Sequence, residues 1–158
     1  MEQSQEFWKF AILLERYCSY QERCKLDVNT KMAKLNTPDS LHLALLDHLE
    51  EQNMLNELRF ATSFTNGKFK YKKWGKIKIY SALAQKRVDR SNIEKALSEI
   101  DDEEYKQTLK ELMDSKSEEI GSIKEDKDKK RLLNFLLQKG YESNLIWGAL
   151  REKERNRG

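Results

Sequence analysis

Hydrophobic residues recur along this chain every three or four positions, the spacing of one buried helical face. The pattern is clearest near the N-terminus, at Phe7, Phe10, Ala11, Leu14, Tyr17 and Cys18. It returns in the last third, for example at Leu132, Leu133, Leu136 and Leu137. No segment alternates strictly enough between hydrophobic and polar residues to predict a strand. The pattern therefore predicts an all-α fold.

The chain also contains an internal repeat. Residues 76–100 align with 129–153 without gaps, with eight identical positions in 25, and a shift of 51 brings the first third into weaker register. A period of about 50 residues, three times over, is typical of stacked repeat units. We predict three tandem three-helix repeats, at 1–54, 55–100 and 101–158, stacked into an elongated, curved body.

Helices are predicted inside each repeat from the same periodicity. The first helices are expected at 5–18, 56–67 and 102–118; the second at 21–35, 75–86 and 126–139; the third at 38–52, 90–99 and 143–154. Asn36, Arg87 and Gly140 align at the turn before the third helix. Glycine and asparagine tolerate the left-handed backbone that often ends a helix, so Arg87 is the unusual member.

The amino-acid composition also favours helices, and it argues against membrane-spanning and disulfide-rich proteins. The 158 residues include 21 Leu, 21 Lys and 18 Glu but two Val, so β-branched residues are scarce. No hydrophobic run reaches the 20 or so residues of a membrane span, and the first six residues lack the form of a signal peptide. Two cysteines cannot form a disulfide framework. We expect a monomeric, cytoplasmic protein without a membrane anchor.

The charge is unevenly distributed. The chain as a whole carries +3, but residues 59–90 hold ten basic side chains against the single acid Asp89, a net +9. Aromatic residues lie between these lysines. Such a surface is typical of proteins that bind a nucleic-acid backbone or an acidic protein, although a solvated lysine face over core aromatics would look similar. We select as candidate contacts Arg59, Lys68, Lys70, Lys72, Lys73, Trp74, Lys76 and Lys78.

Three of these residues have more specific expectations. Trp74 is interpreted first as an anchor for a lysine-rich loop and second as a base-stacking residue. Lys76 is expected either to snorkel, with its ammonium reaching solvent, or to lie at the frayed start of a helix. Lys78 is expected on the face opposite the stripe Ile79, Tyr80, Leu83 and Ala84, open to a partner. A second basic cluster, diluted by acids, adds Lys129, Lys130 and Arg131.

Signals for catalysis or cofactors are weak. His42 and His48 are six residues apart on one predicted helix, as are Cys18 and Cys24 in the chain, and neither spacing suits a metal site. The acids at 101–104 are explained by a helix N-terminus. We predict no enzyme activity, no metal and no cofactor.

The middle repeat resembles the RecX family. The resemblance rests on Arg59-Phe60-Ala61, Lys68-Phe69, the run Lys73-Trp74-Gly75-Lys76-Ile77-Lys78-Ile79, Leu83 and Lys86. The turn Lys139-Gly140-Tyr141 with Ile146 and Ala149-Leu150 looks like the family's last repeat, and Ser19, Glu22, Leu45-Leu46 and Leu49 look like its first. The chain departs from the family at Arg87, where glycine is usual.

The resemblance implies a regulator of the RecA recombinase. RecX-like proteins bind along the RecA filament on single- or double-stranded DNA and mostly inhibit ATP hydrolysis, strand exchange and coprotease activity, in recombination, repair and the SOS response. The residues alone support a helical repeat protein with a basic binding face. Two alternatives stay open at this point: a stand-alone DNA- or RNA-binding module of helix-turn-helix-like units with weak, unspecific affinity, and a scaffold without nucleic-acid contact.

Overall fold

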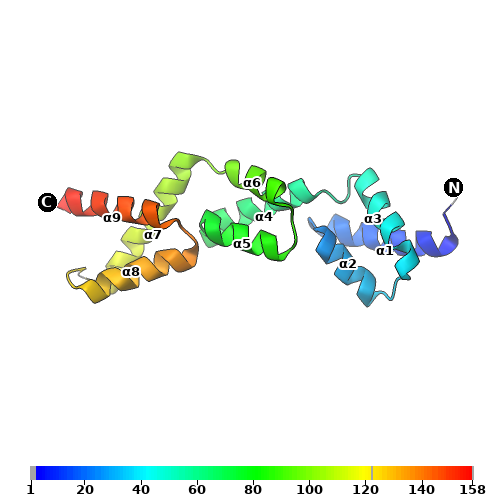
Figure 1. The fold of residues 1–158 in the computed structure, drawn as a ribbon, viewed down its shortest axis with the longest axis horizontal. Coiled ribbons are helices and arrows are strands. Elements are labelled where there is room, and N and C mark those ends of the chain that lie inside the picture. The colour runs from blue at the N-terminus through cyan, green and yellow to red at the C-terminus, as the bar shows by residue number, and fades with distance from the viewer. Residues whose placement is uncertain (1–2, 122, 158) are drawn as a thin grey trace.

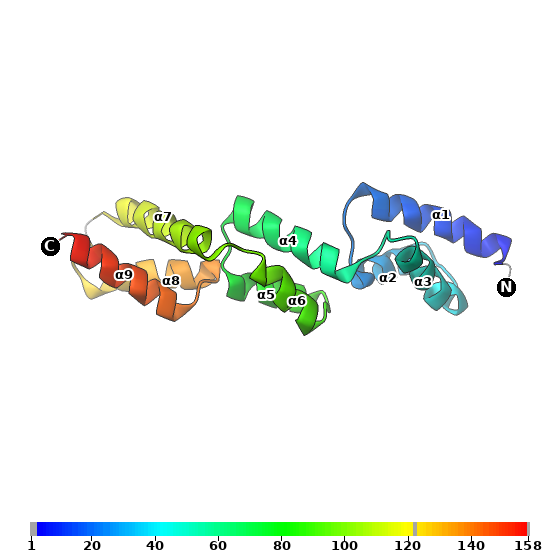
Figure 2. The ribbon, with the colours of Figure 1, turned by 90° about the horizontal axis from the view of Figure 1, so that it is seen from above.

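The computed structural model describes residues 3–121 and 123–157. Within them the chain forms three groups of three helices that follow one another along the long axis, with the termini at opposite ends (Figures 1 and 2). No strand occurs in the described part of the chain. The predicted fold class, three tandem three-helix repeats in an elongated, curved body, is confirmed. The repeat boundaries at 54/55 and 100/101 stay a prediction.

The first unit consists of α1 (Gln5–Tyr20), α2 (Lys25–Lys34), a 3₁₀ turn (Asp39–Leu41) and α3 (His42–Glu51). The predicted hydrophobic face of α1 is buried except at Tyr17, which is half-buried, and packs on Val28 and Met32 of α2 and Leu45 and Leu49 of α3. Ser4 caps α1 by accepting a hydrogen bond from the Phe7 amide.

The second unit consists of α4 (Glu57–Lys72), α5 (Lys76–Gln85) and α6 (Arg90–Ser98). α4 is one turn longer than predicted. Asn66 and Gly67 interrupt the sequence pattern, but Phe69 is buried against Tyr105 of the next unit, with ring centroids 5.9 Å apart. That tertiary contact holds the helix through the weak helix formers.

The third unit consists of α7 (Asp102–Ile120), α8 (Asp126–Lys139) and α9 (Ser143–Arg157). Asp101 caps α7 by accepting a hydrogen bond from the Glu104 amide, as expected for acids at a helix start. Among the described residues, none of the helices has the length and apolar character needed to cross a bilayer.

The aligned turn residues share one backbone conformation. Asn36, Arg87 and Gly140 all have positive φ, at 56°, 62° and 98°. The repeat alignment therefore located a real structural equivalence. The backbone of Arg87 thus adopts the left-handed conformation, which costs a non-glycine residue about 1 kcal/mol or more.

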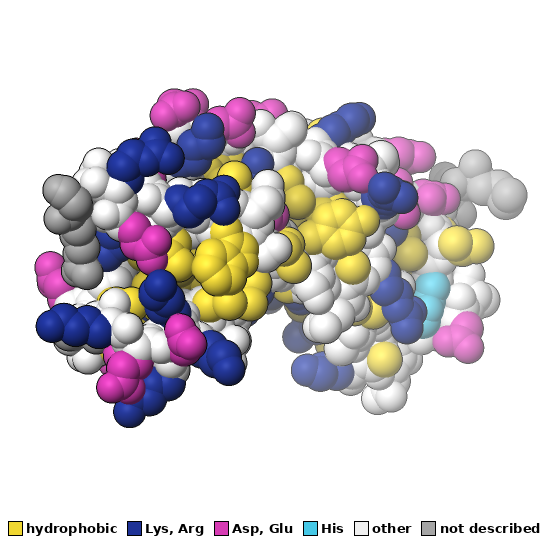
Figure 3. Space-filling model, turned by 60° about the vertical axis from the view of Figure 1, so that its left-hand side comes forward, with side chains coloured by type: hydrophobic (Ala, Val, Ile, Leu, Met, Phe, Trp, Pro, Cys, Tyr) yellow, Lys and Arg dark blue, Asp and Glu magenta, His cyan; other side chains and the backbone are white. Residues whose placement is uncertain are grey.

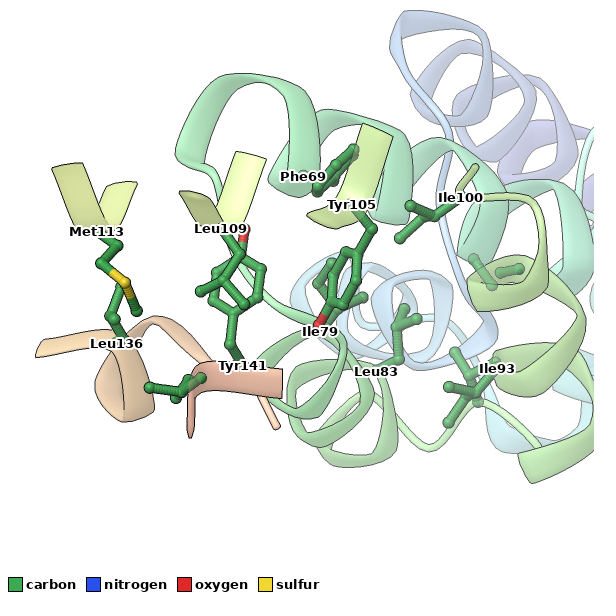
Figure 4. Packing of buried hydrophobic residues seen from close by; sticks show 14 of the residues in the cluster. Phe69, Ile79, Leu83, Ile93, Ile100, Tyr105, Leu109, Met113, Leu136 and Tyr141 are labelled. Atoms are coloured by element: carbon green, nitrogen blue, oxygen red, sulfur yellow. The ribbon is translucent and has the colours of Figure 1, made fainter. Parts of the chain in front are cut away.

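The hydrophobic core divides unequally. One cluster belongs to the first unit, whereas a second runs through the second and third units (Figure 4) and also includes the buried Cys24 of the first unit, with Leu26 packed against it. Polar contacts join the first unit to the second: Arg59 Nε lies 2.6 Å from Glu22 Oε1, and Lys86 Nζ lies 3.2 Å from Asp27 Oδ1. The second and third units thus share one core, to which the first unit is joined by the start of α2 and by these charged pairs.

Candidate binding surface

Most of the lysines predicted to lie in a loop belong to a helix. α4 ends at Lys72, Lys73 takes the left-handed conformation (φ 58°), and the Trp74 amide donates to the Lys68 carbonyl oxygen at 3.1 Å. The loop prediction was wrong because the burial of Phe69 extends the helix. Lys70 and Lys72 therefore occupy the last turn, where cations also offset the partial negative charge of the helix end.

Trp74 anchors this helix end. Its half-buried ring meets Phe64 edge-on at 6.5 Å, and the ammonium groups of Lys68 and Lys78 lie 4.8 and 4.6 Å from the ring centroid. Two cation–π contacts and a core contact leave little of the indole for a nucleobase. Tyr71, 85% exposed, is the open aromatic side chain of this surface.

The α4–α5 turn is bound to the third unit by main-chain hydrogen bonds. The Gly75 amide donates to the Lys139 carbonyl oxygen at 2.7 Å, and the Ile77 amide to the Gly140 carbonyl oxygen at 3.0 Å. A Cβ on Gly75 would lie 2.3 Å from the Gly140 carbonyl oxygen. Only glycine allows this approach, so the turn is positioned from outside its own repeat.

Side chains of the third unit complete the junction. Tyr141 donates to the Lys73 carbonyl oxygen at 2.9 Å, and Lys139 Nζ to the Lys72 carbonyl oxygen at 3.2 Å. Both carbonyls stand at the end of α4, where they lack partners within the helix. Lys139 adds a cation to the surface that sequence reasoning missed, because it lies 67 residues from Lys72.

Tyr105 fixes the start of α5. Its hydroxyl accepts a hydrogen bond from the Lys76 amide at 2.9 Å and donates one to Glu142. Burial, reinforced by the bond to Glu142, raises the pKa of Tyr105 well above its usual range. The phenol thus remains a donor at neutral pH. The Lys76 ammonium lies 5.0 Å from the same ring centroid, so the start of α5 is held in place rather than frayed.

The surroundings of Lys78 differ from the prediction. It is half-buried, and a Cβ on Gly140 would lie 2.3 Å from the Lys78 Cβ, so Lys78 lines the junction instead of an open face. The predicted stripe of α5 is also only partly correct: Ile79 and Leu83 are buried, whereas Tyr80 is half-buried and Ala84 exposed. The close approach of the third unit explains why Lys78 is half-buried.

The remaining candidates fall into two groups. Lys70, Lys72, Lys73, Lys130 and Arg131 are exposed. Arg59 and Lys129 are engaged within the chain: Arg59 pairs with Glu22 and donates to the Asn53 carbonyl oxygen at 3.0 Å, and Lys129 Nζ lies 3.3 Å from Glu154 Oε1. Figure 3 shows basic and acidic side chains intermingled over the C-terminal end. The third repeat is therefore a weaker basic surface than α4.

The histidine and cysteine side chains that could act in catalysis are hydrogen-bonded within the chain or buried. His48 lies 2.7 Å from a Glu15 carboxylate oxygen and edge-on to Trp8. Burial raises the pKa of the Cys18 and Cys24 thiols to about 11, which makes both poor nucleophiles. Across residues 3–121 and 123–157, no group of three or more His, Cys, Asp or Glu side chains is placed to hold a metal ion.

A family model described as "RecX, second three-helix domain" matches residues 56–97, the segment that carries α4, the Trp74 turn, α5 and most of α6. The regulatory protein RecX of Lactobacillus johnsonii is 30% identical over 129 residues, which cover 82% of this chain and 48% of that protein. The chain belongs to the RecX family.

Other RecX proteins are also similar to this chain, in sequence or in fold. Regulatory protein RecX of Clostridium botulinum (strain Eklund 17B) is 34% identical over 72% of this chain and 53% of its own length. The crystal structure of RecX from Lactobacillus salivarius superposes with a TM-score of 0.86 over 95% of this chain and 97% of that one, at 19% identity, and shows the shared fold. The chain spans about half the length of several curated RecX proteins that it matches.

Proposed function

We propose that this chain regulates the RecA recombinase by binding along the RecA filament on single- or double-stranded DNA. It lowers ATP hydrolysis, strand exchange and coprotease activity, and so acts in recombination, repair and the SOS response. It works in the cytoplasm as a monomer, by binding alone and without a cofactor.

One observation carries the proposal: the segment matched by the RecX family model is also the segment with the strong positive charge. Residues 59–90, net +9, lie entirely within the matched range 56–97. A binding surface is therefore expected on the second unit. Its partner carries negative charge, as phosphates or as acidic side chains.

The exposed lysines on the last turn of α4 are suited to that contact. Lys70, Lys72 and Lys73 project from a helix end whose carbonyls are held by Lys139 and Tyr141. A surface that is fixed before binding loses less conformational entropy on association. The helix end thus supplies positive charge on a rigid support.

The test is RecA activity on single-stranded DNA, with the RecA protein of the same organism. ATP turnover and strand exchange should fall at amounts of this protein well below those of RecA. Changing Lys70, Lys72 and Lys73 together to Ala should weaken the effect. Changing Lys95 and Lys106, exposed lysines on α6 and α7, should not.

Unaltered RecA kinetics over a wide concentration range would refute the proposal. A parallel titration of naked duplex DNA addresses the stand-alone alternative. Tight binding to DNA together with unaltered RecA kinetics would favour that alternative.

A further inference from the structure

A second cluster of cations lies in the first unit, between α1 and α2. Here a groove of about 480 Å³ is lined by four basic side chains around two tyrosines: Arg16, Arg23, Lys31, Lys34, Tyr17 and Tyr20. No carboxylate lines this groove. The cluster lies outside residues 56–97, the range of the family match.

Contacts with Tyr17 fix two of these cations. The Arg23 guanidinium carbon lies 3.8 Å from the Tyr17 ring centroid, and Arg23 Nε donates to the Tyr17 carbonyl oxygen at 3.2 Å. Lys31 Nζ lies 5.3 Å from the same centroid. Stacking on an aromatic ring orients a guanidinium and leaves its terminal N–H groups available for an anion.

The acids that would neutralise the groove are paired elsewhere. Residues 13–35 contain three carboxylates. Glu15 contacts His48, Glu22 contacts Arg59, and Asp27 contacts Lys86, at 2.7, 2.6 and 3.2 Å. In the described part of the chain, none of the four groove cations forms an ion pair with a carboxylate. The groove therefore concentrates four positive charges that a bound anion would balance.

The position of Tyr20 indicates which class of anion the groove binds. It is 82% exposed beside the cations, and its ring centroid lies 5.9 Å from the Arg23 guanidinium carbon. A single strand offers an unstacked base to such a ring, whereas the bases of a duplex already stack on one another. Phosphates every few ångströms along the strand match a row of cations. An acidic peptide would use the cations but leave the tyrosine without a role.

We propose that this α1–α2 groove binds single-stranded nucleic acid, with phosphates on the four cations and one base stacked on Tyr20. The site is separate from the lysines of α4. It requires no RecA, so the proposal can fail while the proposed function stands, and the reverse.

The experiment measures binding of a labelled 20-nucleotide dT strand to the full chain by fluorescence anisotropy, from 25 to 200 mM salt. Tyr20→Ala should lower the association constant by about 5- to 150-fold, the range for losing one base–aromatic stack. Arg16→Gln with Lys34→Gln should reduce the slope of log affinity against log salt by about 1.4, or 0.7 for each lost phosphate contact. Lys95→Gln with Lys106→Gln removes the same charge from exposed positions elsewhere and should leave the slope unchanged.

A second readout locates the strand directly. Photo-cross-linking with 5-iododeoxyuridine, followed by tryptic digestion, should label the peptide 17–23, which holds both tyrosines. Far-UV circular dichroism and an unchanged Tm establish that each variant is folded.

Three results would overturn the proposal. One is an equal loss of affinity in the groove variant (Arg16→Gln with Lys34→Gln) and in the charge-matched control, which would show that binding depends only on net charge. Another is wild-type affinity for Tyr20→Ala with cross-links confined to the second unit. The third is displacement of the dT strand by a 20-residue poly-glutamate as effectively as by unlabelled dT, which would assign the groove to an acidic protein segment.

Discussion

The contact between Gly75 and Gly140 should be the least replaceable backbone contact between repeats. In Gly75→Ala the new Cβ would meet the Gly140 carbonyl oxygen at 2.3 Å and the Tyr141 amide nitrogen at 2.5 Å. Both neighbours are backbone atoms and cannot rotate away. The two units must separate locally, which strains the main-chain hydrogen bonds of 2.7 and 3.0 Å.

The magnitude follows from two costs. Overpacking in a dense region costs about 1–3 kcal/mol, and each weakened hydrogen bond about 0.5–1.5 kcal/mol. With both hydrogen bonds weakened, we expect Gly75→Ala to lower the free energy of unfolding by about 2–6 kcal/mol, measured by urea denaturation followed by circular dichroism.

Gly67→Ala is the matched control. Gly67 lies within α4, and a Cβ there meets no atom within 4 Å. Alanine in a helix interior is favoured over glycine by about 1 kcal/mol, so this variant should be more stable than the wild type. If Gly75→Ala proved as stable as the wild type, or both variants lost the same stability, the junction would not have the role assigned to it.

Three further outcomes are expected. Changing the exposed lysines Lys70, Lys72 and Lys73 to Ala should flatten the salt dependence of filament binding by up to about 2 in log–log slope, at 0.7 for each single-strand phosphate contact; an unchanged slope would remove them from the interface. Small-angle scattering should yield a radius of gyration clearly above the value of about 15 Å for a compact chain of this length, and a value at that limit would contradict the extended fold. At pH 8 the Cys18 and Cys24 thiols should react with a disulfide reagent about 100-fold more slowly than in urea, because burial moves their pKa from 9.0 to about 11 and cuts the thiolate fraction accordingly; equal rates would contradict their burial.

Local patterns predicted much of the architecture. The hydrophobic spacing located the helices of the described residues, and the repeat, with shifts of 51 and 53 residues, aligned Asn36, Arg87 and Gly140, which share the left-handed conformation. These features depend on interactions within a few turns of chain, so they can be read from neighbouring residues. The concentration of positive charge in 59–90 is also a property of the chain as written.

Distant contacts decided what local patterns missed. Phe69 reaches Tyr105 of the next unit, which extends α4 beyond Gly67 and places Lys70 and Lys72 on a helix. The third unit covers the Lys78 side of α5, which the sequence pattern left open. Arg59, selected as a partner contact, is held by Glu22, 37 residues away.

The sequence by itself determined the helices, the three-fold repeat and the sign of the charge on the second unit, because periodicity and composition act over short distances. Only the tertiary structure decided which cations are available. A carboxylate neutralises whichever cation the fold brings within about 4 Å of it, and spacing along the chain does not reveal that pairing. Glu15, Glu22 and Asp27 are paired with side chains of other helices or units. The cations of the α1–α2 groove are therefore not neutralised by these carboxylates.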